Sequence, residues 1–120
     1  METHWKEFEK LVARIEETLL PTGAIIKSPD RVRDLVTGKK REVDATIKHK
    51  IGTTNFLIAL ECRKRIHKQN ITWIEQLVSK KKNIGADKII AVATKGFSNE
   101  ATKYASINGI ELRTINEISP

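Results

Sequence analysis

Two carboxylates with cations beside them are the residues of this chain best suited to chemistry. Asp44 lies in the segment EVDATIKHK, and Glu61 ends the apolar run LIALE, which CRKR follows directly. Carboxylates at the ends of neighbouring strands raise each other's pKa unless a cation lies between them. Such hard oxygen ligands suit Mg²⁺, Mn²⁺ or Ca²⁺. A metal beside Arg63, Lys64 and Arg65 would polarise a phosphodiester and activate water, while the cations would stabilise the developing charge.

The two carboxylates meet only if their segments form an antiparallel hairpin. EVDATIKHK alternates in polarity, which predicts a strand, and NFLIALEC predicts a second strand after the turn residues IGTT. A four-residue loop over 51–54 pairs Lys50 with Asn55, and counting outward puts Asp44 opposite Glu61. Their Cβ atoms would then lie roughly 5 Å apart on one face of the sheet. The apolar residues of the first strand are expected on one shared face: Val43, Ala45 and Ile47.

The segments before this hairpin predict a helix, a strand and a loop. Apolar residues recur at helical spacing from Trp5 to Leu20, and GAIIK is a short strand. SPDRVRDLVTGKKR is predicted to be a polar, basic loop with a turn at Thr37-Gly38.

The segments after the hairpin predict two more helices and two strands. NITWIEQLVSKKKNIGAD is a helix that begins with a capping box of Thr72 and Glu75. DKIIAVAT is a strand covered on both faces, and Ser98 caps a third helix. IELRTI is a final strand that runs parallel to it through a right-handed crossover. The prediction is one α/β domain over residues 1–120.

The charge balance favours an anionic partner. Lys and Arg number 22 and Asp and Glu 15, giving a net charge of +7, and the cations cluster in GKKRE, ECRKRIHK and SKKK. Clustered positive charge suits a nucleic-acid backbone. The candidate nucleic-acid-binding residues are Lys39, Lys40, Arg41, Lys64, Arg65 and Lys81.

Cysteine and apolar content restrict the compartment and the kind of metal site. The one cysteine, Cys62, excludes an internal disulfide and a cysteine-based zinc site, and it suits a reducing cytoplasm. The sequence has no apolar run of membrane-spanning length, and METHWKEFEK lacks the apolar stretch of a secretory signal. We therefore expect a cytoplasmic protein.

At this point the motifs resemble a known family. VDATI, a turn and LIALECR resemble the D…(D/E)-x-K signature of the PD-(D/E)XK nucleases, the restriction-endonuclease-like superfamily. From Phe8 to about Ile115, the WIEQL helix, the KIIAVAT strand, the GFSNEATKYA helix and the GIEL strand are similar to its Mrr-type branch. The resemblance implies a restriction-endonuclease-like αβββαβ core, with a mixed central sheet flanked by helices and an extra C-terminal helix and strand. It also implies a DNA endonuclease that depends on Mg²⁺ or Mn²⁺.

The resemblance assigns roles to individual residues. Asp44 and Glu61 would ligate the metal, together with the main-chain carbonyl of Cys62. Gln76 would occupy the place of the helical glutamine that orients groups near the scissile phosphate. Glu16, on the first helix, would be the further acidic ligand that many members add.

One position departs from the family pattern: the motif lysine is Arg63 here. Arginine stays charged, so it stabilises an anion but cannot act as a base. Either the metal activates water without it, or a lysine from elsewhere takes the role, or the domain binds without cutting. The best candidate is Lys80, because residues four apart share a helix face and Lys80 follows Gln76 at that spacing. Arg63 and Lys80 would then both contact the phosphate.

Three functions remain open on the sequence alone. The first is a metal-dependent DNA endonuclease, in which water attacks the scissile phosphate in line. The second is a Holliday-junction resolvase-like nuclease, although the basic, glycine-containing N-terminal opening of that group is absent. The third is a catalytically degenerate DNA-binding module. For a nuclease we expect a homodimer, because cutting two strands calls for two sites; a separate specificity subunit is a further conceivable partner.

Overall fold

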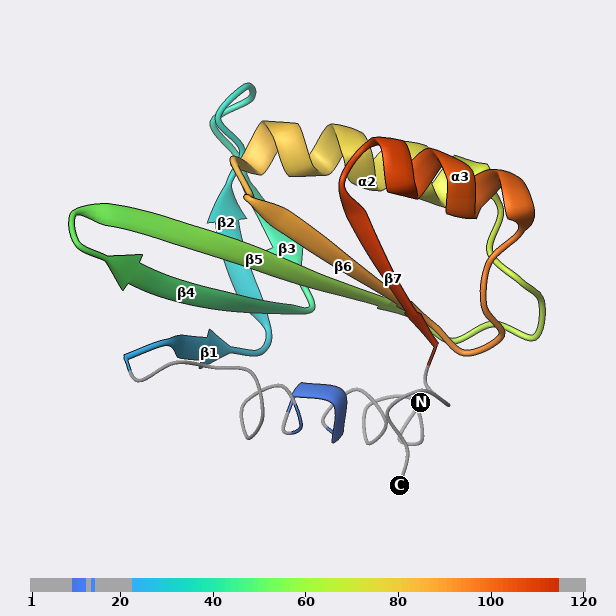
Figure 1. The fold of residues 1–120 in the computed structure, drawn as a ribbon. Coiled ribbons are helices and arrows are strands. Elements are labelled where there is room, and N and C mark those ends of the chain that lie inside the picture. Colours follow the sequence, from blue (N-terminus) through green and yellow to red (C-terminus); the bar gives the residue numbers. More distant parts are fainter. Residues whose placement is uncertain (1–9, 13, 15–22, 115–120) are drawn as a thin grey trace.

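The computed structural model describes residues 10–12, 14 and 23–114 of the 120 (Figure 1). Most of the predicted first helix lies outside these residues, and Trp5 and Glu16 lie outside them too. The described residues of that segment, 10–12 and 14, are helical, and Leu11 is buried against the sheet.

A mixed five-stranded sheet forms the centre of the protein (Figure 1). Its strands are, in spatial order, β1 (Ile25–Lys27), β4 (Ala45–Ile51), β5 (Thr54–Arg63), β6 (Lys88–Ala93) and β7 (Ile110–Thr114). β1, β4 and β5 are antiparallel, whereas β5, β6 and β7 are parallel. The parallel pairs require crossovers, which α2 (Ile71–Ile84) and α3 (Asn99–Ile107) supply on one face of the sheet. This is the predicted fold class.

Each face of the sheet has its own apolar core. Under α2 and α3 the core contains Ala59 and Ala91 from the sheet and Ile74 and Leu77 from α2. On the opposite face a second cluster surrounds Leu60. β6 is apolar at almost every position because it is covered on both sides, as the sequence predicts.

The register of the β4–β5 hairpin is the predicted one. Lys50 pairs with Asn55, and the ladder continues to Ala45 opposite Leu60. The strands extend one residue further toward the turn than expected, so Ile51 pairs with Thr54 and only two residues connect them. A two-residue turn needs a left-handed backbone, and Gly52 supplies it with φ of 62°.

The predicted strand over EVDATIKHK is broken at Asp44. β3 (Lys40–Val43) ends just before this residue, β4 begins just after it, and the chain bends between them. Val43 therefore packs under α2, whereas Ala45 and Ile47 pack on the opposite face. The expectation that all three share a face was wrong, because alternation holds only along an unbroken strand.

The predicted loop over residues 28–41 was also wrong. β2 (Asp30–Arg33) and β3 form a separate two-stranded antiparallel sheet. The expected turn at Thr37-Gly38 lies within the connection between these strands. The many charges concealed this β-hairpin, because only its inner face, with Val32 and Val43, is apolar.

One of the two predicted helix caps is confirmed and the other is wrong. Ser98 caps α3 and accepts a hydrogen bond from the backbone N–H of Ala101, as predicted. α2 is capped by Asn70, whose side chain accepts from the N–H of Thr72 at 3.0 Å, and not by Thr72 itself. Asparagine is at least as good a cap as threonine, so the helix begins two residues earlier than a Thr72 cap would allow.

Candidate active site

Asp44 and Glu61 lie side by side at one end of the β4–β5 hairpin. The ladder stops at Ala45 and Leu60, so these two residues are the next pair outward. The Asp44 carboxylate reaches along β5 and accepts a hydrogen bond from the backbone N–H of Cys62 at 2.8 Å. The Asp44 carboxylate is thus hydrogen-bonded to the backbone of Cys62, the residue next to Glu61.

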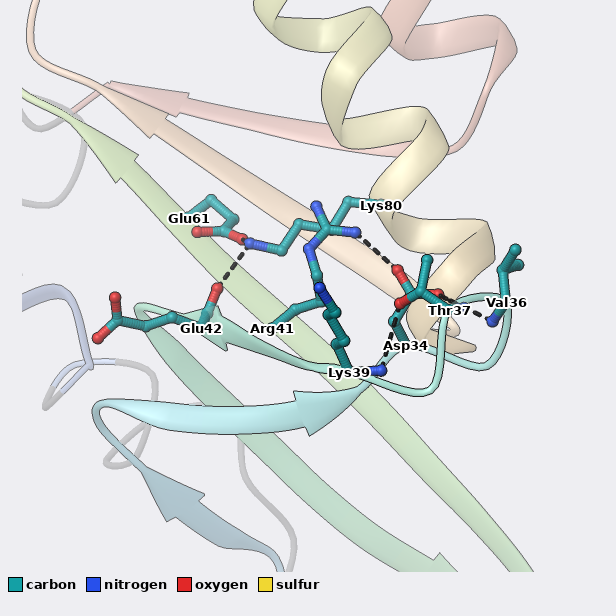
Figure 2. A network of polar contacts seen from close by, with 8 residues as sticks. All are labelled: Asp34, Val36, Thr37, Lys39, Arg41, Glu42, Glu61 and Lys80. Atoms are coloured by element: carbon teal, nitrogen blue, oxygen red, sulfur yellow. Dashed lines mark hydrogen bonds and ion pairs between the residues drawn. The ribbon is translucent and has the colours of Figure 1, made fainter.

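Lys80 of α2 closes this site from the helix side (Figure 2). Its ammonium forms an ion pair with Oε2 of Glu61 and donates a hydrogen bond to the carbonyl of Glu42 at 2.7 Å. Glu61 is only 9% exposed. Among the described residues, Oε2 of Glu61 has no polar partner besides that ammonium.

The pKa of Glu61 is raised above its usual value, mainly because the carboxylate is buried. The neighbouring Asp44 carboxylate raises it further. The Lys80 ammonium and the backbone N–H of Asp44 oppose this shift without overcoming it. A second cation at this position would therefore be favourable.

The donor atoms suit a hard divalent cation. The described residues contain no cluster of three or more His, Cys, Asp or Glu side chains. Mg²⁺, however, is commonly held by one or two carboxylates and completed by water and phosphate oxygens. Asp44 and Glu61 supply two such carboxylates, and the buried Oε2 of Glu61 is an oxygen with a single partner. The residues present fit Mg²⁺ or Mn²⁺.

Arg63, at the position of the motif lysine, has Trp73 and Gln69 as partners and forms no ion pair with Glu61 among the described residues. Its guanidinium lies 4.9 Å from the ring centroid of Trp73 and donates to the side-chain oxygen of Gln69 at 3.3 Å. Trp73 in turn stacks on Phe97, with the ring centroids 6.2 Å apart. Burial and then the nearby Arg65 lower the pKa of Arg63, while Glu61 opposes this.

The sequence did not reveal the partners of Arg63. Trp73 is buried on α2. Its stack with Arg63, however, depends on the path of the chain from β5 to α2. Gln69 is fixed there by backbone hydrogen bonds with Gly96 and Ser98, contacts that no local sequence pattern reveals.

The remaining predicted site residues differ in their surroundings. Gln76 is exposed on α2, one turn before Lys80, and its role stays a prediction. The Cys62 side chain packs with the cluster on the face opposite α2, as expected from strand alternation, and its main-chain role stays a prediction. Glu16 lies outside the described residues.

The predicted nucleic-acid-binding cations do not all have free side chains. Lys39, Lys40, Lys64 and Arg65 are exposed, whereas Arg41 is half-buried and pairs with Asp34 at 2.9 Å. Lys81 is also half-buried, with its ammonium next to Gly109 at the start of β7.

The mixed sheet, its two crossover helices and the carboxylates at the end of the β4–β5 hairpin define a restriction-endonuclease-like fold. The chain belongs to the restriction endonuclease family of the Mrr type, because the Mrr_cat family model, described as "Restriction endonuclease", matches residues 1–119. No curated protein matches the chain.

Solved structures share this fold at low sequence identity. A protein of unknown function, AF1548, matches with a TM-score of 0.69 and 20% identity over 90% of this chain and 56% of its own. The DNA modification-dependent restriction endonuclease AspBHI matches with a TM-score of 0.60 and 18% identity over 92% of this chain and 29% of its own.

A third structure, the MspJI restriction endonuclease in complex with a 27-mer oligonucleotide, has a TM-score of 0.59 and 14% identity. The match covers 97% of this chain and 26% of the MspJI chain. The chain therefore spans about half of AF1548 and under a third of the two restriction endonucleases. Within the described residues, no helix is long and apolar enough to cross a membrane.

Proposed function

We propose that this chain is a metal-dependent DNA endonuclease in which Lys80 takes the role of the family's motif lysine. The observation that carries the proposal is the ion pair between the Lys80 ammonium and the buried Glu61 carboxylate, next to Asp44. The restriction endonuclease family and the DNA-acting enzymes with the same fold support DNA as the substrate. The metal and the hydrolytic activity are part of this proposal.

In this mechanism Asp44 and Glu61 hold Mg²⁺ or Mn²⁺, with the Cys62 main-chain carbonyl as a further ligand. When bound, the metal polarises the phosphate and lowers the pKa of the attacking water. Glu61 gains a full counter-charge, which a buried carboxylate with a raised pKa requires.

Lys80 then becomes free to act on the substrate. Its ammonium is bound to Glu61 and to the Glu42 carbonyl, so it lies at the site before any substrate arrives. Lysine has a flexible stem and three donor hydrogens, so it can hold a phosphate oxygen or the attacking water while it keeps one protein contact. Gln76, one helical turn away, is proposed to orient the same phosphate.

Arg63 has a different proposed role. Its planar guanidinium is occupied by Trp73 and Gln69, so it positions the connection from β5 to α2. Its predicted phosphate contact is secondary in this proposal. In this proposal Lys80 supplies the ammonium that the family's motif lysine supplies elsewhere, which the ion pair of Lys80 with Glu61 supports.

Cleavage of supercoiled plasmid with Mg²⁺ or Mn²⁺ tests the proposal. Wild type should nick the plasmid, and Glu61→Gln and Asp44→Asn should each lower the rate by at least about 10²-fold, as loss of a metal ligand does. Glu75→Gln, which changes an exposed carboxylate of α2, is the matched control and should cut as wild type does.

The same assay separates the other two functions. A protein that binds DNA and leaves it uncut with both metals is the degenerate binding module. A protein that cuts a four-way junction and spares linear duplex is the resolvase-like nuclease. For the proposed cut in both strands, sedimentation with DNA should reveal two copies of the chain per site.

A further inference from the structure

Three cations of the β2–β3 strands, Arg31, Arg33 and Lys40, lie on the outer face of this hairpin, whereas Arg41 lies on the inner face. Arg33 and Lys40 are directly opposite each other in the register, as are Arg31 and Glu42 one pair further along. Residues that face each other share a side of a two-stranded sheet, so Arg33 and Lys40 point the same way. The alternate residues include Val32 and Val43, which pack against the core under α2.

Two like charges opposite each other are unfavourable without an anion. Cross-strand like-charge pairs destabilise a hairpin, because their side chains lie within a few ångströms of each other. Arg33 and Lys40 are both exposed, and neither side chain forms an ion pair with any residue that the structure describes. Glu42 lies on the same face, opposite Arg31, and its carboxylate forms no ion pair with Arg33 or Lys40 among the described residues, while both aspartates of the hairpin face other cations. Asp30 pairs with Lys48 and Asp34 with Arg41.

The turn of this hairpin is fixed in place by Asp34 (Figure 2). Asp34 is 1% exposed, and its carboxylate accepts hydrogen bonds from the backbone N–H groups of Val36 and Thr37 and from the Arg41 guanidinium. The backbone of Leu35 is also tied to the end of α2, because its N–H donates to the carbonyl of Asn83 at 2.7 Å. The tip is therefore a preformed projection.

The tip presents two apolar side chains to solvent. Leu35 is 70% exposed and Val36 72% exposed, between Arg33 at the end of β2 and Lys40 at the start of β3, with Lys39 in the connection. A rigid turn with adjacent exposed aliphatic residues is a cost to a protein in water. The cost is offset if a partner covers them.

The hairpin also leads directly to the candidate active site. β3 ends at Val43, the residue before Asp44, so Lys40 is about 13 Å along the strand from the metal-binding position. Lys80 fixes the same strand by its hydrogen bond to the Glu42 carbonyl. A phosphate held at Arg33 and Lys40 would lie a few base pairs from the phosphate that is cut.

We propose that the β2–β3 hairpin is a DNA-contacting arm. Arg33 and Lys40 bind one backbone phosphate of the duplex, and Leu35 and Val36 contact its sugars and base edges in the groove. This inference rests on the proposed function, because it takes duplex DNA as the partner. Charge complementarity favours DNA over a protein surface, since the exposed cations surround the apolar tip. Apolar side chains between cations are the pattern by which many proteins enter the DNA groove.

Equilibrium binding to a short labelled duplex, measured by fluorescence anisotropy over a series of KCl concentrations, tests the arm. EDTA removes divalent metal, so binding is measured without cleavage. Arg33→Gln/Lys40→Gln should weaken binding and lower the slope of log K against log[salt] by about 1, the effect of one lost phosphate contact. Leu35→Ser/Val36→Ser should weaken binding about tenfold with the slope unchanged, because it removes apolar contact only.

Matched controls come from residues remote from the hairpin in sequence. Lys95→Gln/Lys103→Gln removes two exposed cations, and Ile107→Ser removes an aliphatic side chain that is 82% exposed. Both controls should bind more like wild type than the hairpin variants do. All four variants change exposed side chains, so none should melt below wild type, and Arg33→Gln/Lys40→Gln should melt at the same or a higher temperature because it removes the like-charge pair.

Three results would overturn the arm. If wild type binds duplex with a clear salt dependence and the hairpin variants bind equally well, the arm is wrong and the proposed function stands. If wild type does not bind duplex at all, both fail. If Leu35→Ser/Val36→Ser leaves DNA binding intact and abolishes self-association in sedimentation, the tip is a protein–protein contact.

Discussion

Glu61 and Arg63 are two residues apart on β5 and face the same side of the sheet, yet their surroundings differ. Glu61 is buried with a single ion pair, and its pKa is raised first by burial and then by the neighbouring Asp44 carboxylate. Arg63 has both a stacking partner, Trp73, and a hydrogen-bond acceptor, Gln69. One side chain is left in need of a ligand and the other is satisfied by the protein.

The difference shows that the cation beside Glu61 comes from α2 and not from the motif position on β5. A lysine ammonium is a compact charge that can approach a carboxylate from any element, and here it approaches from α2. A guanidinium is planar and stacks well on tryptophan, so at position 63 it can stabilise a loop. The cation that pairs with Glu61 is thus determined by the packing of α2 on the sheet and not by the spacing of residues along β5.

Replacing Lys80 and Arg63 one at a time should give the largest difference in cleavage rate. Lys80→Met should lower the rate of plasmid cleavage by about 10²–10³-fold, because it removes the group proposed to stabilise charge at the phosphate. Arg63→Met should lower it less than tenfold. Single-turnover rates with saturating protein measure both effects without interference from DNA binding.

The opposite order of these two effects would contradict the roles proposed for Lys80 and Arg63. If Arg63→Met abolished cleavage and Lys80→Met left it intact, the arginine would be the catalytic cation and the ion pair on α2 only structural. Lys82→Met, a change of an exposed lysine near the end of the same helix, controls for the loss of a charge from α2.

The sequence predicted the central sheet and the pairing of its two carboxylates correctly for a physical reason. Strand alternation and the turn residues fix the register of a hairpin, so Lys50 opposite Asn55 was sufficient to bring Asp44 to Glu61. Helical spacing from Gln76 predicts Lys80 as the candidate lysine, and its ammonium does lie at Glu61, although Gln76 itself is exposed. These are local regularities, and local regularities can be read from a single sequence.

The sequence failed where tertiary contacts decide the structure. Asp34 resembles one more polar loop residue, yet it is buried and organises a hairpin through bonds to Val36, Thr37 and Arg41. The contacts of Arg63 with Gln69 and Trp73 were also missed, because these partners lie beyond a loop whose path no local pattern predicts, while its phosphate contact stays a prediction. Charged segments hide such structure, since their charges suggest solvent exposure.

Metal binding should stabilise the folded protein through Glu61 and should not depend on Arg63. Mg²⁺ at ten times its Kd should stabilise the folded protein by about 1.4 kcal/mol and raise the melting temperature by roughly 3–6 °C. Glu61→Gln should remove this shift, whereas Arg63→Met should keep it. Differential scanning fluorimetry with and without Mg²⁺ measures both.

The pH dependence of this stabilisation has a defined sign. The pKa of Glu61 is raised on folding, so without metal wild type should gain stability relative to Glu61→Gln as the pH falls toward its ordinary value of 4.5. With Mg²⁺ the trend should reverse, because protons compete with the metal for the carboxylate. A Mg²⁺ shift that persisted below that pH would mean that the metal binds elsewhere.

The smallest effect expected is that of Arg63→Lys, which restores the family's lysine to its usual position. Lysine lacks the planar group that stacks on Trp73, so the variant should lose about 1 kcal/mol of unfolding free energy in urea. Cleavage should not increase, because Lys80 already supplies an ammonium to Glu61. An increase of tenfold or more would show that the site lacks a lysine and that the arginine has weakened the enzyme. An unchanged rate with lower stability would mean that this position now serves the fold.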